Sequence, residues 1–479
     1  MRRSNPARGL TLAAAVGAVL ALAASPAVAA KPHGSLVQLD GRKGCVVDQS
    51  ALHQGCRLVR SLLGPAPFTG SNAVAVSPDG RNVYVASSES DTVTVLRRAG
   101  KRLVQPQGRA GCIGGGPFSG CVPAGALDKP TSVAVSPNGK HVYVAAMRSS
   151  AVSVMARDRH TGALRQTGCI SARPRPGCTT GRALRGVDVV AASPDGANVY
   201  AGSFKDGAVV SFAQTRQGLT QIGCVSDRAR GCAPGTALGG VEGLAVSPDG
   251  DNVYAAAAIS SSVAVLERRA GGELIQPPPP AGCLSQSTLD GCRSARVTGG
   301  ADAVAVAPDG KNVYVAAGLD DGMAIFSRDT DTGALRQLPG TAGCMVNAAA
   351  IACSLGRAFV DPEGVAVSPD NKNVYVGAFG SGAVDVFNRK RQQDGRLIQK
   401  QKRLGCIVKR RTPGCTRGRA LAAANAIALS PSGGRVYVGA FRADAVAVFR
   451  RVTGGGGGGG GCPCGSAVSD PGRGVARRK

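Results

Sequence analysis

Six acidic and amide side chains recur at one position of a repeated phrase and form a candidate metal site. Each stands five residues before a Ser-Pro or Ala-Pro step; they are Asn72, Asp188, Glu242, Asp302, Glu363 and Asn425, and the seventh copy of the position is Thr131. Oxygen-only ligands suit a hard divalent cation, and calcium more than magnesium, because calcium accepts more and less regular oxygen ligands. A cation would also offset the repulsion between clustered carboxylates. The alternative is that each side chain only caps the backbone of a neighbouring repeat.

A second group of candidate residues is basic and indicates an anionic ligand. The formal net charge of the chain is +27 at pH 7, which favours anionic partners. The richest stretches contain Arg173, Arg175, Arg182 and Arg185, and then Lys409, Arg410, Arg411, Arg417 and Arg419. We interpret them as a rim that binds an anionic polymer or a protein at the cell surface; the alternative is a solvated surface. Nucleic acid is not expected, because no helix, aromatic platform or known motif supports it. No organic cofactor is predicted.

Fourteen of the sixteen cysteines fall into seven local pairs. The pairs are Cys45 with Cys56, Cys112 with Cys121, Cys169 with Cys178, Cys224 with Cys232, Cys283 with Cys292, Cys344 with Cys353 and Cys406 with Cys415. In an exported protein such a pattern predicts disulfides. Zinc is disfavoured, because the spacing is too long for its sites and the chain has only four histidines. The partners of Cys462 and Cys464 stay open between each other, a second molecule and a cell-surface component.

The acidic and amide positions, the cysteine pairs and the basic stretches belong to one repeat unit. The unit occurs seven times with a period of 54 to 62 residues, and each copy contains the same short phrase. The phrase is clearest over residues 74–85, Val-Ala-Val-Ser-Pro-Asp-Gly-Arg-Asn-Val-Tyr-Val. Each repeat offers four short apolar runs separated by turn residues, which are strand and hairpin signals. Four antiparallel strands make one propeller blade, and seven blades close a ring. The sequence therefore predicts an all-β, seven-bladed β-propeller of four-stranded antiparallel blades.

The two ends of the chain are predicted to meet in the last blade. Residues 34–39 resemble the fourth strand of a repeat, and the last repeat lacks its own fourth strand. An N-terminal strand therefore completes blade seven and closes the ring. All seven tyrosines share one repeat position, where an aromatic ring fills the space between blades and its hydroxyl finds a buried acceptor.

Rotational repetition places the candidate residues on one face of this ring. The entrances of the first strands and the loops with the cysteine pairs lie at the same end of every blade. The acidic positions are therefore expected around the channel mouth, inside a basic collar. No Ser-His-Asp arrangement can be assembled, because His141 replaces the usual Asn before Tyr143 and His160 falls in a turn at the opposite end. Any catalysis would rest on carboxylates and a metal.

The flanking segments differ from the repeats. Residues 1–30 are predicted to be a signal peptide, since arginines precede an apolar run and small residues offer a cleavage site. The apolar run is shorter than the roughly 20 residues that span a bilayer, so no membrane span is expected in the mature chain. Residues 31–452 form the propeller, and residues 453–479 a flexible, basic, glycine-rich tail with Cys-Pro-Cys. We expect an exported monomer, secreted or associated with the cell surface.

The repeated phrase Ser-Pro-Asp-Gly-x-Asn-Val-Tyr-Val, found over residues 71–450, resembles the YVTN-type repeats of the lactonase-like propellers, which include the 6-phosphogluconolactonase type. The stretches that begin at Glu242 and Glu363 resemble first-strand entrances of gluconolactonase and paraoxonase-type calcium propellers, in which an Asn, Asp or Glu at this position holds the ion. That second match is local, and those propellers have six blades. The cytoplasmic sugar-phosphate lactonases lack an export signal and this cysteine framework, so their substrate is not transferred.

Three functions follow from these observations. The first is a noncatalytic module that binds an anionic polymer or a protein through the basic face. The second is a metal-dependent lactonase with a cation in the channel, which polarises a carbonyl and activates water. The third is a purely structural scaffold. Propellers host both binding and catalysis, so the fold does not decide between them.

Overall fold

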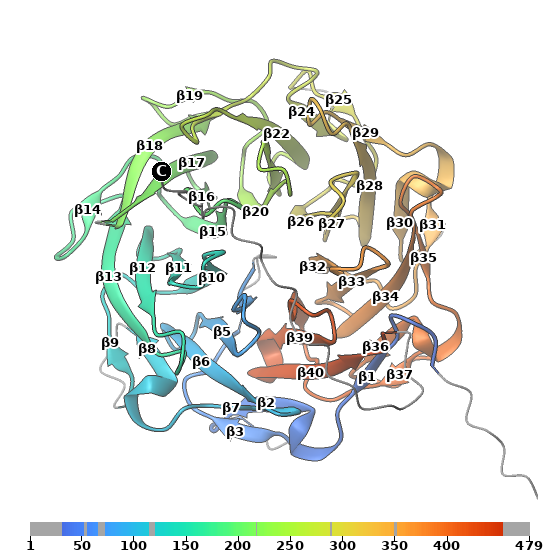
Figure 1. Cartoon of the computed structure of the whole chain (residues 1–479). Helices are drawn as coiled ribbons and strands as arrows, with labels where there is room; N and C mark the ends of the chain where they lie inside the picture. Colours follow the sequence, from blue (N-terminus) through green and yellow to red (C-terminus); the bar gives the residue numbers. More distant parts are fainter. Residues whose placement is uncertain are drawn as a thin grey trace, which may run out of the picture.

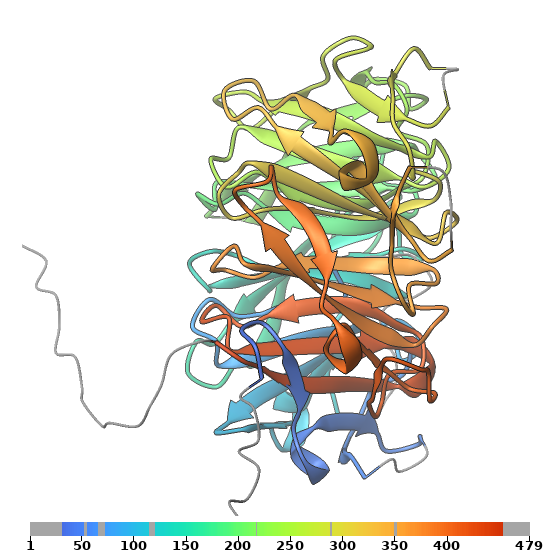
Figure 2. The same cartoon turned by 90° about the vertical axis from the view of Figure 1, so that its right-hand side faces the viewer.

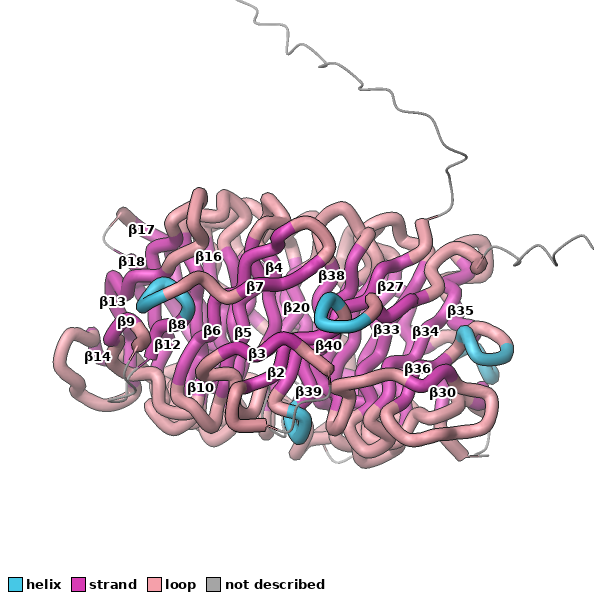
Figure 3. Tube along the Cα trace, turned by 90° about the horizontal axis from the view of Figure 1, so that it is seen from below, coloured by secondary structure: helices cyan, strands magenta, loops and turns pink. Residues whose placement is uncertain are grey.

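A computed structural model describes residues 31–51, 55–65, 72–114, 120–216, 218–287, 290–348 and 352–453. Seven sheets stand around a central axis like the blades of a propeller (Figure 1). Seen from the side, they form a disc in which loops gather on two opposite faces (Figures 2 and 3). This confirms the predicted fold class. The predicted signal peptide, the tail and Cys462 and Cys464 lie outside the described residues.

Every blade begins with three antiparallel strands. The innermost strands are β4 (Val74–Val76), β10 (Pro130–Val135), β15 (Val187–Ala192), β20 (Val241–Val246), β26 (Ala301–Val306), β32 (Pro362–Val367) and β38 (Ala424–Leu429). The second strands are β5 (Asn82–Ser87), β11 (His141–Ala146), β16 (Asn198–Ser203), β21 (Asn252–Ala257), β27 (Asn312–Ala317), β33 (Asn373–Ala378) and β39 (Arg435–Ala440). The third strands are β6 (Thr92–Ala99), β12 (Ala151–Arg157), β17 (Ala208–Thr215), β22 (Ser262–Arg268), β28 (Gly322–Arg328), β34 (Ala383–Lys390) and β40 (Ala445–Arg451).

The fourth strand is continuous in blades two and three, as β13 (Leu164–Ser171) and β18 (Gly218–Ser226). In the other blades it is split into β1 (Leu36–Gln38) and β2 (Cys45–Asp48), β7 (Arg102–Val104) and β8 (Cys112–Gly114), β23 (Leu274–Ile275) and β24 (Cys283–Ser285), β29 (Leu335–Gln337) and β30 (Cys344–Val346), and β35 (Arg396–Gln399) and β36 (Cys406–Val408). Short 3-10 turns bridge four of these splits: η1 (Gly41–Lys43), η2 (Gly108–Gly111), η3 (Gly340–Gly343) and η4 (Lys402–Leu404). A further turn, η5 (Phe441–Ala443), lies in blade seven.

The seven predicted disulfides are all present, with the predicted pairing. They join Cys45 to Cys56, Cys112 to Cys121, Cys169 to Cys178, Cys224 to Cys232, Cys283 to Cys292, Cys344 to Cys353 and Cys406 to Cys415. In every pair the first cysteine lies on the fourth strand of a blade, and the second lies beside the segment that returns along this strand.

Each returning segment adds a short parallel strand that the sequence did not predict. These outermost strands are β3 (Arg57–Val59), β9 (Val122–Pro123), β14 (Thr179–Thr180), β19 (Ala233–Pro234), β25 (Arg293–Ser294), β31 (Ser354–Leu355) and β37 (Thr416–Arg417). A disulfide between positions 8 to 11 residues apart holds both strands side by side. The predicted four-stranded blades therefore carry a fifth strand at their outer edge.

The Ser-Pro-Asp-Gly phrase forms the turn between the first and second strands. In blade one, the Ser77 hydroxyl accepts a hydrogen bond from the Asn82 amide at 2.9 Å, and the Asp79 carboxylate accepts one from the Arg81 amide at 3.0 Å. Gly80 has a φ of +65°, which glycine adopts without strain. The hairpin is thus specified locally, before the blades pack.

The ring closes as predicted. β1 pairs antiparallel with β40, beside which it lies in Figure 1. The Gly34 amide donates to the Val452 carbonyl at 2.6 Å, and the Val452 amide donates to the Ser35 carbonyl at 2.9 Å. All seven tyrosines are buried between blades. Within the described residues, no helix is long and apolar enough to cross a membrane.

Candidate functional site

The predicted acidic positions coincide with β-bulges. In six blades the register between the first and second strands shifts at one residue. These residues, here called the bulge ring, are Thr131, Asp188, Glu242, Asp302, Glu363 and Asn425. A bulge re-aims the side chain of its extra residue. Asn72 differs, because it precedes the short strand β4 and its side chain is exposed.

The bulge ring is buried. Its carboxyl residues are 0% (Asp188), 4% (Glu242), 9% (Asp302) and 4% (Glu363) exposed. Neighbouring first strands approach so closely that a Cβ on Gly364 would lie 1.8 Å from the Asn425 carbonyl oxygen, and one on Gly243 would lie 2.8 Å from that of Asp302. The carboxyl groups are thus buried between adjacent blades. This differs from the expectation from the sequence, which placed them around an open channel mouth.

The buried carboxyl groups bond to each other and to nearby amides. Glu242 and Asp302 share a hydrogen bond. The Asn425 side-chain amide donates to Glu363 at 3.3 Å, and the Gly318 amide donates to Asp302 at 2.9 Å. Two of these hydrogen bonds join neighbouring blades, blade four to blade five and blade six to blade seven.

Burial raises the pKa of three of these carboxyl groups, those of Glu242, Asp302 and Glu363. Loss of hydration, with the neighbouring Asp361 and Asp302 charges, raises the pKa of Glu363 to about 10. Burial and the charge of Asp188 raise the pKa of Glu242, and burial raises that of its partner Asp302. Among the described residues, no three His, Cys, Asp or Glu side chains are arranged so as to hold a metal ion.

The channel is apolar at the opposite face. A cavity of about 440 Å³ is lined there by Asn72, by first-strand residues such as Ala192, Val246 and Val306, and by turn prolines such as Pro194. Within the residues that the structure describes, the lining contains no acid and no base, and its one hydroxyl side chain is that of Ser430. Of the predicted metal residues, only Asn72 reaches this cavity.

The predicted basic rim divides into two groups. Lys409, Arg410, Arg411, Arg417 and Arg419 line one cavity of about 870 Å³, together with Gln38 and Gly418. We call it the basic cavity; it lies where blade six meets the N-terminal strand of blade seven. A neighbouring cavity of about 680 Å³ shares Arg411 and Arg417 and adds Arg403, which sequence reasoning missed because it lies in the preceding turn η4. No acidic residue in the described part of the chain lines either cavity.

Arg419 also has a structural role. Its guanidinium donates to the Leu39 and Gly41 carbonyls at 3.2 and 3.0 Å, so it binds blade six to the N-terminal segment. Lys409, Arg410, Arg411 and Arg417 are exposed and form no salt bridge within the described residues. They are therefore the free cations of the basic cavity.

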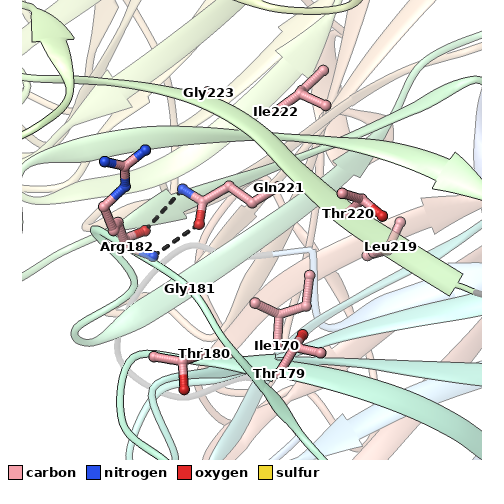
Figure 4. A pocket seen from close by; sticks show the side chains of 10 residues that line it. All are labelled: Ile170, Thr179, Thr180, Gly181, Arg182, Leu219, Thr220, Gln221, Ile222 and Gly223. Atoms are coloured by element: carbon pink, nitrogen blue, oxygen red, sulfur yellow. Dashed lines mark hydrogen bonds between the residues drawn. The ribbon is translucent and has the colours of Figure 1, made fainter.

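The second basic group lies on blade two. Arg185 pairs with Asp206 at 2.6 Å. Arg182 lines a separate groove of about 370 Å³ between β14 and β18, which Figure 4 shows. Arg173 and Arg175 are exposed on the adjoining disulfide loop. This group does not join the basic cavity of blades six and seven.

Comparison with known proteins agrees with this fold. The family model described as Lactonase, 7-bladed beta-propeller matches residues 59–181 and 189–342. The chain belongs to this family. Among curated proteins, none matches the chain.

Several solved structures are similar to the chain in fold. Hydrazine synthase of Kuenenia stuttgartiensis has a TM-score of 0.51 at 17% identity, over 84% of this chain and 99% of that one. A putative 6-phosphogluconolactonase of Bacteroides uniformis has a TM-score of 0.48 at 20% identity, over 70% and 84%. The periplasmic gluconolactonase of Pseudomonas aeruginosa has a TM-score of 0.49 at 20% identity, over 68% and 82%. At these identities the likeness concerns the fold alone.

Proposed function

We propose that this lactonase-family propeller is an exported, noncatalytic binding module that takes anionic polymers in the basic cavity. The observation that carries the proposal is the cavity itself, in which Lys409, Arg410, Arg411 and Arg417 face one space with no acidic residue among them. Like charges held this close repel one another, and a polyanion offsets that repulsion.

Export is part of the proposal. The seven disulfides are of the kind that persists in oxidising surroundings. The apolar segment before residue 30 supports the same location. The burial of the bulge ring supports a binding role over catalysis, because its carboxyl groups are withheld from any substrate in solution.

The test is the replacement of Lys409, Arg410, Arg411 and Arg417 by glutamine, with titration of labelled heparin at several salt concentrations. Arg419 stays unchanged because it also holds the N-terminal segment. We expect binding to weaken about tenfold or more and its salt dependence to flatten, since fewer ion contacts form. A matched control replaces Lys101, Arg102, Arg109 and Arg159, which are equally exposed and lie elsewhere. Equal losses of heparin affinity in both variants would show that only the net charge matters. They would refute the basic cavity as the binding site.

A metal-dependent hydrolase is the second candidate, and the convergence of carboxyl groups on Gly318 favours it. A Cβ at Gly318 would lie 2.5 Å from an Asp361 oxygen and 2.6 Å from an Asp302 oxygen. Asp361 is only half-buried, and burial and the charge of Asp321 raise its pKa. As they stand, these groups do not form a ligand set, so Asp302, Glu242 and Glu363 would have to lose protons to hold calcium. A bound cation would supply polarisation of a lactone carbonyl and activation of water.

Calorimetry separates the two candidates. Calcium is titrated into chelator-treated wild-type protein and into a Glu242→Gln, Glu363→Gln double variant. Saturable binding to the wild type that the variant loses would support the hydrolase. Heat within the dilution blank, with no calcium-dependent gain in melting temperature, would remove its basis and leave the polymer-binding proposal intact.

A further inference from the structure

The outer strand of blade three, β18, leaves much of its outer edge without a partner. It is nine residues long. The parallel strand β19 pairs only with Val225 and Ser226 at its end. Within the described part of the chain, no strand pairs with the outer side of Gly218–Gly223, here called the edge segment. Alternate backbone groups of such a strand point away from its neighbour and are available to a further strand.

The edge segment lacks the protection that the other blades have. Exposed edges in natural sheets are usually blunted by short length, charge or proline. The corresponding strands of four other blades carry an arginine, namely Arg102, Arg165, Arg336 and Arg396. β23 runs into four prolines at 277–280, and β1 is only three residues long. The edge segment, Gly-Leu-Thr-Gln-Ile-Gly, has neither a charge nor a proline.

A preformed groove runs beside the edge segment. It is lined by Thr179, Thr180 and Gly181 on one side and by the backbone and side chains of residues 219–223 on the other (Figure 4). Gln221 fixes its width, because the Gln221 side chain accepts from the Arg182 amide at 2.8 Å and donates to the Arg182 carbonyl at 3.2 Å. Every second side chain of an added strand would enter this groove.

The charge around the groove selects the partner. Arg182 lines the groove, Arg216 precedes the edge segment by two residues, and Arg173 and Arg175 belong to the disulfide loop that leads into β14. All four are exposed, and none forms a salt bridge within the described residues. The exposed Glu273 lies beside Gly223, the last residue of the edge segment, so the arginines act mainly on the part before it. A second copy of this chain is disfavoured by its net charge of +27. The chain's own segment 454–479 carries four basic residues and one acidic residue, so it is not complementary either.

From these observations we propose that an acidic, extended segment of another protein docks as an added strand on the edge segment of β18. Main-chain hydrogen bonds to β18 supply affinity, and the arginines select acidic side chains. This site does not rest on the proposed polymer binding, which uses the basic cavity between blades six and seven.

The test uses a fluorescent nine-residue peptide of alternating valine and glutamate as the probe, with the full chain. A twin peptide that is N-methylated at alternate backbone positions keeps the charge but removes the N–H groups that a strand needs. We expect saturable binding of the probe and about tenfold or more weaker binding of the twin. Leu219→Pro should cause a similar loss, because it removes an amide from the edge. Leu219→Ala, which keeps that amide, is the matched control and should change the dissociation constant by less than about threefold.

Amide hydrogen exchange of the wild type gives an independent readout if Leu219→Pro does not fold. Exchange in the edge segment should slow when the probe binds, while exchange at Arg165 in blade two should not. The proposal is overturned if the N-methylated twin binds as tightly as the probe, if the slowed amides lie elsewhere, or if the probe does not bind at about 1 mM.

Discussion

At the scale of single residues, the bulge ring shows how one repeat position acquires its chemistry from packing. The same bulge carries threonine, asparagine, aspartate or glutamate in different blades. The Thr131 hydroxyl donates to the Asp188 carbonyl across the blade boundary at 2.6 Å, as a cap would. In Glu242, Asp302 and Glu363 the pKa of the carboxyl group is raised instead, because close packing withholds water from it. Backbone capping and carboxyl groups with a raised pKa thus occur side by side in one ring.

Glu363 should make stability depend on pH when no cation is bound. Its folded pKa of about 10 exceeds the ordinary value of 4.5. The folded state keeps a proton that the unfolded chain releases, so the free energy of unfolding falls as pH rises between these values. The slope from this group is at most about 1.4 kcal/mol per pH unit. Replacement by glutamine should flatten the slope and stabilise the protein at pH 8 by about 1 kcal/mol or more.

Chemical unfolding in chelator at pH 5, 7 and 9 measures this effect. Glu273→Gln is the control, because Glu273 is exposed and should leave the pH profile unchanged. A Glu363→Gln variant that is less stable than the wild type at pH 8 would mean that the carboxylate is charged and compensated in the folded protein.

At the scale of strands and blades, two repeated contacts join each blade to the next. A glutamine in the first part of the fourth strand, or directly after it, binds both the amide and the carbonyl of one residue in the preceding blade. This contact, the glutamine clamp, occurs at Gln38, Gln105, Gln166, Gln221, Gln276, Gln337 and Gln399. The second contact, the arginine latch, is an arginine at the end of the third strand that reaches the Asp, Asn or Tyr of the preceding blade; the arginine is buried in four of the five latches and partly buried at Arg268. It occurs at Arg157, Arg268, Arg328, Arg389 and Arg451.

The latch explains much of the repeated phrase. The Asp, Asn and Tyr of Ser-Pro-Asp-Gly-x-Asn-Val-Tyr together surround one guanidinium. Where blade two has Asn138 and His141 in place of Asp and Asn, blade three has Gln214 in place of the arginine, and the Tyr143 hydroxyl donates to it at 2.6 Å. The acceptors and the donor therefore change together, as expected of a buried charge that needs its partners.

Removal of one latch should destabilise the whole protein. Arg389 donates to the Tyr314 hydroxyl at 2.8 Å and to Asp309 at 2.8 Å. Arg389→Ala leaves the buried Tyr314 hydroxyl and the partly buried Asp309 carboxylate without their partner, so we expect a loss of roughly 3 kcal/mol or more in the free energy of unfolding. Arg396→Ala in the same blade should change it by less than about 0.5 kcal/mol, because Arg396 is exposed. Denaturant unfolding measures both; similar values for the two variants would contradict the latch.

Local patterns in the sequence predicted the strands, the disulfides and the shared tyrosine position, because short-range spacing determines each of them. For five of the seven tyrosines the predicted buried acceptor is the carbonyl of a glycine in the next blade, as for Tyr84 and Gly162 at 2.9 Å. The latches and clamps were missed, although Leu-x-Gln recurs before Gly-Cys in all seven repeats. Their partners lie 39 or more residues away, so only the packed blades reveal them. Burial of the bulge ring depends on the distance between blades and has no local signal either.

At the scale of the whole molecule, the two junctions that flank blade seven are unequal. Between blades six and seven, the latch of Arg451 to Tyr375 at 2.7 Å and the clamp of Gln38 are complete. Between blades seven and one, Ser432 and Arg435 replace the acidic and amide acceptors, and the buried Nη1 of Arg435 has no hydrogen-bond partner among the described residues. The N-terminal strand therefore stabilises the stronger junction, and the ring depends on it for closure.

Deletion of residues 31–39 should open the ring at this junction. It removes the pairing of β1 with β40, the hydrogen bond from the Tyr375 hydroxyl to the Gly34 carbonyl at 2.8 Å, and the Gln38 clamp. We expect a loss of about 3 kcal/mol or more, since each such bond contributes about 1 kcal/mol and buried partners are left unsatisfied. The edge of β40 also becomes exposed over Phe449 to Arg451, the residues that pair with β1, so unfolding should lose cooperativity and aggregation should increase.

Calorimetric melting and denaturant titration measure this loss, with two matched controls. Gln38→Ala removes the clamp but keeps the strand, so it should give a part of the loss with a single transition. Truncation after Thr453 removes a segment beyond the last strand and should leave the melting temperature unchanged. Because blade seven contains both ends of the closed array, its outer strand belongs to the cooperative unit. An unchanged melting curve after deletion of residues 31–39 would mean that the remaining strands of blade seven, β38, β39, β40, β2 and β3, close the ring without β1.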